Sequence, residues 1–386
     1  MTTTDTVPFI VDDHRLTLFA EGPDRLTALI ALIDGAERTL RLLYYIYADD
    51  QSGQCVRAAL SRAIARGVRV AMIVDGFGVA AGAGFFRPLV DAGADVCRYE
   101  PRFGRRYLLR NHQKLALADE ARVMIGGFNV EDDYFGTVEA GAWRDLGLLV
   151  DGAAAARIAR YFDALIAWTH SAKPRIRDLR AILKQHSEMQ VPGQVRWLFG
   201  GPTRRLSPWA LAVKSDMARA RRLDMIAAYF APNPAMLRRI ERIVRRGGRA
   251  TVMTAAKSDN EATVAAARHC YDRLLRRGVA VLEYGVTKLH SKLFVIDDVV
   301  HIGSANFDVR SLYLNLELML RIEDAAFADH LRGYFADEAK GCRVIEKADH
   351  AKIGWLRRVQ WGLAYFIVAV VDANVTRRLN FGIDGR

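Results

Sequence analysis

Hydrophobic and polar positions follow two different periods along the chain. The segments Arg25–Leu40 and Cys55–Ala65 carry apolar residues at helical spacing, and Gly67 follows the second as a typical residue of a helix end. The apolar runs Leu42–Tyr47 and Val68–Val74 are short and bounded, as is typical of buried strands. Helices that alternate with strands in this way predict a layered α/β fold.

The second part of the chain repeats the plan of the first. ARGVRVAMIV at Ala65–Val74 resembles RRGGRATVMT at Arg245–Thr254, and DAGADVCRYE at Asp91–Glu100 resembles RRGVAVLEYG at Arg276–Gly285. In both parts a His–x–Lys sequence and a Gly-rich turn with an asparagine come next. Matches in the same order indicate an internal duplication.

The duplication divides the chain into four parts. We predict a first half over residues 1–170, a polar and basic linker over 171–194, and a second half over 195–345. Residues 346–386 form an apolar and basic tail outside the repeat.

Each half carries the pattern His–x–Lys–x4–Asp. Its members in the two halves are His112, Lys114 and Asp119, and His290, Lys292 and Asp297. We place the first histidine in a strand over His112–Leu117, where side chains two apart share a face, so each histidine and lysine should point the same way. The two aspartates belong to the motif but start turns, so we expect them to hold the loop through backbone N–H groups.

This set of side chains suits a reaction at a phosphodiester. A phosphodiester is anionic, so an enzyme without a metal must offset its charge with fixed cations and hydrogen-bond donors. The lysines supply charge, and Asn129, Ser304 and Asn306 in the Gly-rich turns are predicted to bind phosphate. One imidazole can attack phosphorus and a second can protonate the leaving oxygen, so the halves should share one site.

The two histidines need partners that set their protonation. A carboxylate bonded to the far ring nitrogen fixes the tautomer and the orientation of an imidazole. Asp145 in WRDLGLLV and Glu317 in NLELML occupy apolar, strand-like settings, where a lone carboxylate is costly. We predict that they orient the histidines; the alternative is a structural ion pair with an arginine.

Composition narrows the class of partner. The formal net charge of +12 and the pI of about 9.7 favour anionic partners: nucleic acid, anionic lipid or phosphate esters. The four cysteines form no CxxC pair, which argues against a zinc site or a disulfide framework, so neither a metal nor another cofactor is predicted. The N-terminal residues lack the pattern of a signal peptide.

The tail contains the longest apolar run of the chain. Trp361–Val371 lies between the arginine pairs 357–358 and 377–378, and it is too short to span a bilayer comfortably. Two interpretations stay open: a buried C-terminal helix, or a segment in a membrane interface. On the second interpretation the aromatic residues at the lipid boundary would be Trp361, Tyr365 and Phe366.

Taken together, these motifs resemble the phospholipase D superfamily and, within it, the bacterial cardiolipin synthases. The resemblance covers roughly Leu16–Glu323 and is most specific in LHSKLFVIDDVVHIGSANFDVRSLYLNLELML, which is similar to the family's GSANFDxRS run followed by Asn–x–Glu. NHQKLALAD, GGFN and WRD are similar to the first family motif, with GG where the superfamily pattern has GS. The best-known members begin with two transmembrane helices, and this chain looks more like the shorter members.

The resemblance implies two α/β/α units whose sheets face a shared cleft. It implies a phosphatidyl-enzyme intermediate on histidine, with His112 as nucleophile and His290 as acid, and no metal. The implied reaction moves a phosphatidyl group between two phosphatidylglycerol molecules and releases glycerol. Anionic phospholipids, phosphatidylglycerol and cardiolipin, are the implied partners of a protein in the bacterial cytoplasm, peripheral to the inner membrane. The acceptor stays open: phosphatidylglycerol, phosphatidylethanolamine, another alcohol or water.

Two other functions fit the same residues. A hydrolase, or a phosphodiesterase acting on nucleic acid, would use the same histidines and lysines, with basic runs at residues 173–180 and 238–249. Those runs lack interleaved aromatic residues for base stacking, so nucleic acid is the less favoured partner. A non-catalytic anion-binding protein is disfavoured because both His–Lys pairs are complete. No oligomeric state is predicted.

Overall fold

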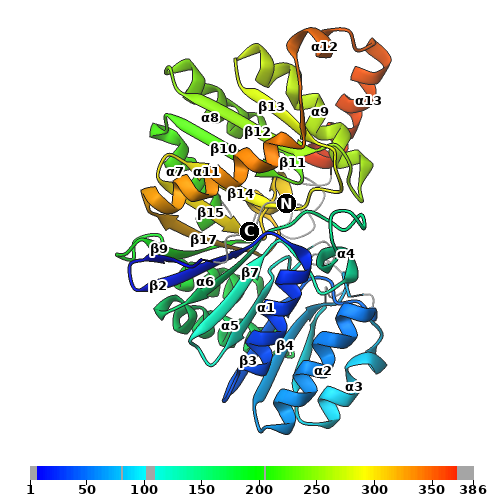
Figure 1. Ribbon diagram of the computed structural model, residues 1–386, viewed down its shortest axis with the longest axis vertical. Coiled ribbons are helices and arrows are strands. Elements are labelled where there is room, and N and C mark those ends of the chain that lie inside the picture. Colours follow the sequence, from blue (N-terminus) through cyan, green and yellow to red (C-terminus); the bar gives the residue numbers. More distant parts are fainter. Residues whose placement is uncertain (1–6, 80, 101–108, 204–205, 372–386) are drawn as a thin grey trace.

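The chain folds around two large β-sheets, one from each half (Figure 1). The computed structural model describes residues 7–79, 81–100, 109–203 and 206–371, and the statements below refer to these residues. The first sheet has, in spatial order, β1 (Phe9–Val11), β2 (His14–Phe19), β8 (Gly147–Asp151), β7 (Arg122–Gly126), β6 (Leu115–Ala118), β3 (Thr39–Tyr44), β4 (Arg69–Asp75) and β5 (Asp95–Tyr99).

The second sheet has the same plan. Its strands, in spatial order, are β18 (Cys342–Val344), β13 (Ala280–Tyr284), β12 (Arg249–Ala255), β10 (Arg222–Ala227), β14 (Lys292–Ile296), β15 (Val299–Gly303), β17 (Glu317–Glu323) and β9 (Val195–Gly200). A short parallel pair joins β11 (Phe230–Ala231) and β16 (Phe307–Asp308).

Strand order and direction repeat between the sheets. The order β2-β8-β7-β6-β3-β4-β5 corresponds to β9-β17-β15-β14-β10-β12-β13. Strands β3, β4 and β5 of the first sheet pair in parallel, as do β10, β12 and β13 of the second. Strands β3 and β10 also pair antiparallel with β6 and β14, respectively. The predicted duplicated α/β fold is therefore confirmed.

Helices cover both outer faces and fill the space between the sheets. The helices that precede the tail are α1 (Gly22–Asp34), α2 (Gln51–Ala65), α3 (Ala83–Asp91), α4 (Asp132–Phe135), α5 (Ala153–His170), α6 (Ile176–His186), α7 (Pro208–Arg219), α8 (Pro234–Arg245), α9 (Glu261–Arg276), α10 (Val309–Tyr313) and α11 (Ala325–Lys340). One hydrophobic core lies between the sheets and includes side chains of both sheets and of α5 and α11. The two halves therefore share their central core.

The predicted helices and strands occur with shifted ends. Helix α1 ends at Asp34 rather than Leu40, because the chain leaves the helix at Gly35 and enters β3 at Thr39. Helix α2 begins at Gln51 rather than Cys55, because the Asp50 side chain caps it by accepting a hydrogen bond from the Gly53 N–H at 2.8 Å.

The two histidines lie just before their strands, not within them as predicted. The reason is that their backbones pair with the opposite half. The N–H of His112 donates to the carbonyl of Leu316 at 2.9 Å, and that of His290 donates to the carbonyl of Arg144 at 2.7 Å. Strands β6 and β14 start only after these contacts.

The linker contains helix α6, which packs against the sheets with Leu179 and Leu183 fully buried. Arg177 and Lys184 are exposed on the outer side of this amphipathic helix, while Arg180 is half-buried and its Nε donates to the carbonyl of Pro202 at 2.7 Å. We keep the division at residues 1–170, 171–194 and 195–345 as a proposal.

The tail forms α12 (Lys347–Ala351), α13 (Trp355–Tyr365) and a π-helical turn, Phe366–Val371. The Trp361 side chain is only 8% exposed and stacks on His350, while the Tyr365 hydroxyl donates to the carbonyl of Pro232 at 2.7 Å. The interface interpretation required Trp361 and Tyr365 to face outward, and neither of them does. The arginine pair at 377–378 lies outside the described residues. Within the described part, no helix is long and apolar enough to cross a membrane.

The motif aspartates lie in turns. The Asp119 carboxylate accepts backbone N–H groups of Glu37, Arg38 and Thr39 at 2.7–2.8 Å, and Asp297 accepts those of Arg221 and Arg222. Both aspartates have a positive φ, near 50°, which aspartate tolerates better than most residues. Their contacts fit the structural role expected from their turns.

The Asp119 contacts predict a loss of stability without a loss of chemistry. Burial raises the pKa of Asp119, but the three backbone N–H groups outweigh it and the net pKa is lowered. The stabilisation is therefore present above the unfolded-state pKa and lost as pH falls through the folded-state pKa. We expect Asp119→Ala to lower the free energy of unfolding by about 1–2 kcal/mol in urea titrations at pH 7, and by less at pH 3. Lost turnover with unchanged unfolding would contradict this role.

Candidate active site

His112 and His290 line one cavity of about 410 Å³ between the two halves. The other residues around it are Tyr45, Ile46, Phe77, Arg110, Asn129, Tyr134, Tyr229, Asp259, Asn260, Asn306, Asp308, Arg310 and Asn315. Since both halves contribute to the lining, the cavity exists only where the two sheets meet.

Each histidine is paired with a carboxylate from the opposite half. Nδ1 of His112 lies 3.0 Å from Oε2 of Glu317, and Nδ1 of His290 lies 2.7 Å from Oδ2 of Asp145. Both carboxylates are fully buried. A carboxylate against Nδ1 assigns the N–H to that nitrogen, so Nε2 is the ring atom available to a substrate.

Backbone contacts between the halves bring these pairs together. Two isolated parallel bridges join Asn111 to Leu316 and Arg144 to Leu289. Asn111 and Leu289 directly precede His112 and His290 in the chain, and Leu316 and Arg144 directly precede Glu317 and Asp145. Each bridge therefore brings a histidine close to the carboxylate of the opposite half. The buried guanidinium of Arg25 also donates to the Asp145 carbonyl at 2.6 Å, which holds that segment to the first half.

The buried carboxylates have further hydrogen-bond donors. The Ser304 hydroxyl donates to Oε2 of Glu317 at 2.6 Å, and the Ser311 hydroxyl donates to Oε1 at 2.8 Å. The N–H of Leu146 donates to Oδ1 of Asp145 at 2.7 Å. Ser304, predicted to bind phosphate, is thus placed behind Glu317 and is not among the lining residues.

Burial governs the protonation of the histidines. Burial, reinforced by Lys292, lowers the pKa of His290 to about 4, and burial lowers the pKa of His112 although Glu317 opposes it. Burial raises the pKa of Asp145 and Glu317, but the neighbouring histidines and lysines outweigh it and the net pKa of both is lowered. At pH 7 both rings are therefore neutral and both carboxylates ionised.

The two lysines lie beside the histidines, one layer below the cavity surface. Nζ of Lys114 donates to the carbonyl of His112 at 2.7 Å, and Nζ of Lys292 donates to the carbonyl of His290 and lies 2.6 Å from its Nδ1. Burial lowers the pKa of both lysines, that of Lys292 to about 8. At neutral pH Lys292 still carries its positive charge.

The two asparagines occupy equivalent positions on the cavity wall. Oδ1 of Asn129 accepts the N–H of Ile46 at 3.0 Å, and Oδ1 of Asn306 accepts the N–H of Tyr229 at 3.3 Å. Because Oδ1 of each asparagine is held by a backbone N–H, the orientation of its Nδ2 amide group is fixed as well. The structure brings both asparagines to the cavity beside the histidines.

Several lining residues were not singled out from the sequence. Aromatic rings contact both imidazoles: Tyr45 lies 5.2 Å from His112, and Tyr134 lies 5.1 Å from His290 between ring centroids. Arg110 and Arg310 add two cations to the wall. Arg310 was within reach of sequence reasoning, because it occupies the Arg of the GSANFDVRS run.

Gly127 is required by close packing. Neither Gly126 nor Gly127 has a positive φ, so a left-handed backbone is not the reason for these glycines. A Cβ atom at Gly127 would lie 2.6 Å from Oδ1 of Asp145 and 3.0 Å from the carbonyl oxygen of His290. Only glycine allows the Asp145–His290 pair to occupy this space.

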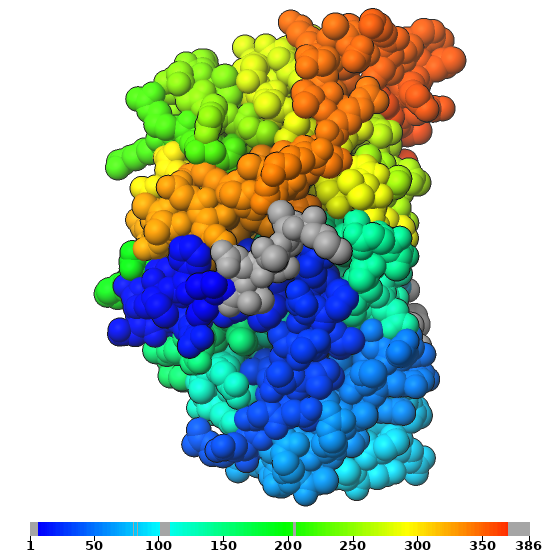
Figure 2. Space-filling view, viewed as in Figure 1, coloured from blue at the N-terminus to red at the C-terminus, as the bar shows by residue number. Residues whose placement is uncertain are grey.

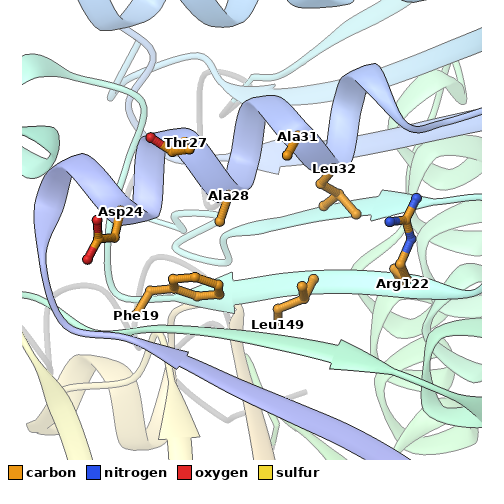
Figure 3. A pocket seen from close by; sticks show the side chains of 8 residues that line it. All are labelled: Phe19, Asp24, Thr27, Ala28, Ala31, Leu32, Arg122 and Leu149. Carbon is orange, nitrogen blue, oxygen red and sulfur yellow. The ribbon is translucent and has the colours of Figure 1, made fainter. Parts of the chain in front are cut away.

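A second cavity lies away from the histidines, between helix α1 and strands β2, β7 and β8 (Figure 3). It is lined by Phe19, Asp24, Thr27, Ala28, Ala31, Leu32, Arg122 and Leu149. It holds no predicted site residue, so we assign the chemistry to the cavity with the histidines.

The segments that contain this site match the model of a known protein family. The family model described as "Cardiolipin synthase, PLD-like domain" matches residues 29–166 and 214–338, which include both His–Lys pairs. The chain belongs to this family. It is an enzyme of the phospholipase D superfamily, of the transferase type, and the predicted family and fold class are confirmed.

Relatives and solved structures agree with this assignment. The cardiolipin synthase of Listeria monocytogenes serotype 4a (strain HCC23) is 29% identical over 351 residues, which are 84% of this chain and 70% of that protein. Cardiolipin synthase A of Pseudomonas entomophila (strain L48) is 28% identical over 367 residues, covering 93% and 75%. A solved phosphatidylserine synthase of Haemophilus influenzae Rd KW20 has a TM-score of 0.70 at 14% identity, covering 97% and 98%, and it shows the fold alone.

The contacts of Gly127 predict a loss of turnover. We expect Gly127→Ala to lower kcat/KM about 100-fold, because the added methyl group displaces Asp145 and misorients His290. The matched control is Gly333→Ala in α11, where a Cβ atom meets nothing within 4 Å; this variant should keep full activity. Equal activity of the two variants would show that the geometry around Asp145 is unimportant.

The lowered pKa of Lys292 predicts an alkaline limit to activity. Its positive charge is lost as pH rises through about 8, so kcat/KM should fall above that pH. Lys292→Arg keeps its charge at higher pH and should move the fall upward, whatever its maximal rate. A fall that stays near pH 8 in Lys292→Arg would assign the titration to another group.

Proposed function

We propose that the protein is a cardiolipin synthase-type phosphatidyltransferase that moves a phosphatidyl group from one phosphatidylglycerol to another and releases glycerol. The observation that carries the proposal is the single cavity lined by both histidines, each with a buried carboxylate on its Nδ1. The relatives, named cardiolipin synthases and 27–29% identical over most of the chain, support a phospholipase D-type phosphatidyltransferase.

The first step proposed is attack by His112. Its neutral Nε2 forms a bond to the phosphorus of phosphatidylglycerol, and the bond from phosphorus to the headgroup glycerol oxygen breaks. His290, protonated on Nε2 when the anionic phosphate is bound, gives its proton to that oxygen, and glycerol leaves. A phosphatidyl group then remains on His112.

The second step reverses these roles. The headgroup hydroxyl of a second phosphatidylglycerol gives its proton to Nε2 of His290, and its oxygen forms a bond to phosphorus. The bond between phosphorus and Nε2 of His112 breaks, which regenerates the neutral imidazole and releases cardiolipin. Water in place of the second lipid would give phosphatidic acid.

The protonation states of the histidines are compatible with this order of steps. The nucleophile needs a neutral imidazole, and burial keeps His112 neutral. His290 must gain a proton, and the ionised Asp145 at 2.7 Å stabilises the imidazolium that forms once an anionic phosphate enters. The charges of Lys114 and Lys292, with the amides of Asn129 and Asn306, are the proposed stabilisers of the pentacoordinate phosphorus.

Anionic phospholipids are the proposed partners, and we place the protein on the inner membrane of a bacterium as a peripheral protein. The direct test is to incubate the purified protein with phosphatidylglycerol vesicles and to identify products by mass spectrometry. Cardiolipin together with glycerol supports the transferase. Phosphatidic acid without cardiolipin supports the alternative hydrolase, and turnover of nucleic acid alone would contradict the lipid substrate.

The shared site predicts that both imidazoles are indispensable. His112→Ala and His290→Ala should each lower turnover more than about 100-fold while the thermal unfolding midpoint stays close to that of the wild type. His269→Ala is a control, because His269 lies on α9 and stacks on Tyr365, outside the cavity lining. Near-normal turnover of either site variant would contradict a two-histidine mechanism.

A further inference from the structure

Helix α13 and the turn after it carry apolar side chains on their outward face. Six large apolar side chains of this segment are 49–71% exposed: Trp355, Leu356, Val359, Leu363, Phe366 and Ile367. Two adjacent pairs, 355–356 and 366–367, are connected through Val359 and Leu363 by steps of three or four residues, which places all six on one face of a helix. We call these six side chains the α13 apolar face.

The opposite face of the segment is already occupied. Trp361 is buried, Tyr365 stacks on His269 of α9, and Ala369 packs with Ala231 and Ala266. The segment is thus attached to the second half through its inner face. Figure 2 shows α12 and α13, in orange and red, at the surface of one end of the molecule. Because the inner face is already packed, the outward apolar side chains form an exposed hydrophobic patch, which is typical of an interaction site.

We propose that the α13 apolar face docks into the surface of an anionic lipid bilayer and brings the substrate cavity to the membrane. A short helix of this kind lies in the interface, where apolar side chains enter the acyl boundary and charged residues stay among headgroups. The proposal rests on the proposed function for the identity of the lipid substrate. The docking itself rests on the exposed apolar side chains, the charge of the segment and its position beside the cavity.

The segment that carries the α13 apolar face has an excess of basic residues, which suits an anionic surface. Between Cys342 and Val371 the chain has only two acidic residues, Glu346 and Asp349, and five basic ones: Arg343, Lys347, Lys352, Arg357 and Arg358. Four of the basic residues are exposed, all but Arg358. Arg343 and Arg357 line a cavity with Trp361 on the inner side of α13, and Lys352 forms an ion pair with Asp349 at 3.1 Å. Basic residues beside an apolar helix face attract anionic headgroups, and salt weakens that attraction.

The α13 apolar face also leads to the substrate cavity. The segment crosses α9, and its contacts move toward the N-terminal part of that helix: Gly362 and Tyr365 lie beside His269, and Ala369 packs with Ala266. The N-cap residue of α9 is Asn260, which lines the cavity. The segment therefore approaches the cavity as it proceeds.

Its last described turn packs against a residue that lies between two residues of the cavity wall. Val368 and Ala369 pack in one cluster with Val309, whose neighbours Asp308 and Arg310 both line the cavity. On the first half, Phe77 lines the cavity and is 60% exposed. A bilayer bound to the α13 apolar face would thus lie next to the opening through which a lipid headgroup must enter.

The test uses the full-length chain and a double variant, Val359→Asp with Leu363→Asp. Both side chains are about 60% exposed, so the charges should leave the fold intact. We expect at least a tenfold loss of affinity for phosphatidylglycerol vesicles in sedimentation assays, while turnover of a short-chain, soluble phosphatidylglycerol is unchanged. The matched control is Val90→Asp with Leu211→Asp, two exposed apolar residues on α3 and α7, which should bind vesicles like the wild type.

Each other outcome is decisive. Vesicle binding that survives in the α13 double variant would overturn the proposal, and so would a wild-type protein that does not sediment with vesicles. A wild-type dimer that the double variant converts to monomers in lipid-free buffer would show that the face pairs two copies of this chain. Vesicle binding lost in the variant, with no lipid turnover by the wild type, would refute the proposed function and leave the docking surface standing.

Discussion

The pairing of each histidine with a carboxylate of the other half is the interaction on which the rest of the structure depends. A buried carboxylate without a partner is costly. The histidine that pairs with each buried carboxylate comes from the opposite half. The halves must therefore close on each other before Asp145 and Glu317 are satisfied. The shared core, the two backbone bridges and the glycine at position 127 all hold the halves at the distance this exchange requires.

The same exchange sets the electrostatics of the cavity. Burial alone would leave the carboxylates protonated and the lysines neutral. Because opposite charges meet in one dry layer, the pKa of Asp145 and of Glu317 is lowered, and Lys292 stays charged at neutral pH. The site thus presents neutral imidazoles among fixed charges. In the proposed mechanism His290 gains its proton when an anionic substrate binds.

The sequence predicted the parts of this site better than their arrangement. Periodicity and repetition predicted the duplicated α/β fold, and the motifs named the residues that reach the cavity, such as Asn129 and Asn306. Which carboxylate meets which histidine depends on contacts between distant segments, which local spacing does not encode. The same limit misplaced the hydroxyl of Ser304. An apolar run likewise does not reveal which side packs inward, so the interface interpretation put Trp361 on the wrong face of α13, whereas the interpretation as a buried helix has it inside.

Nuclear magnetic resonance of the protein with ¹⁵N-labelled histidine tests the exchanged pairs most directly. A ring N–H bonded to a carboxylate gives a strongly deshielded proton, so His112 and His290 should each show one at Nδ1. The account predicts that Asp145→Asn shifts the His290 signal alone and that Glu317→Gln shifts the His112 signal alone. If Asp145→Asn instead shifts the His112 signal, or neither variant alters either ring, the histidines are not paired across the halves.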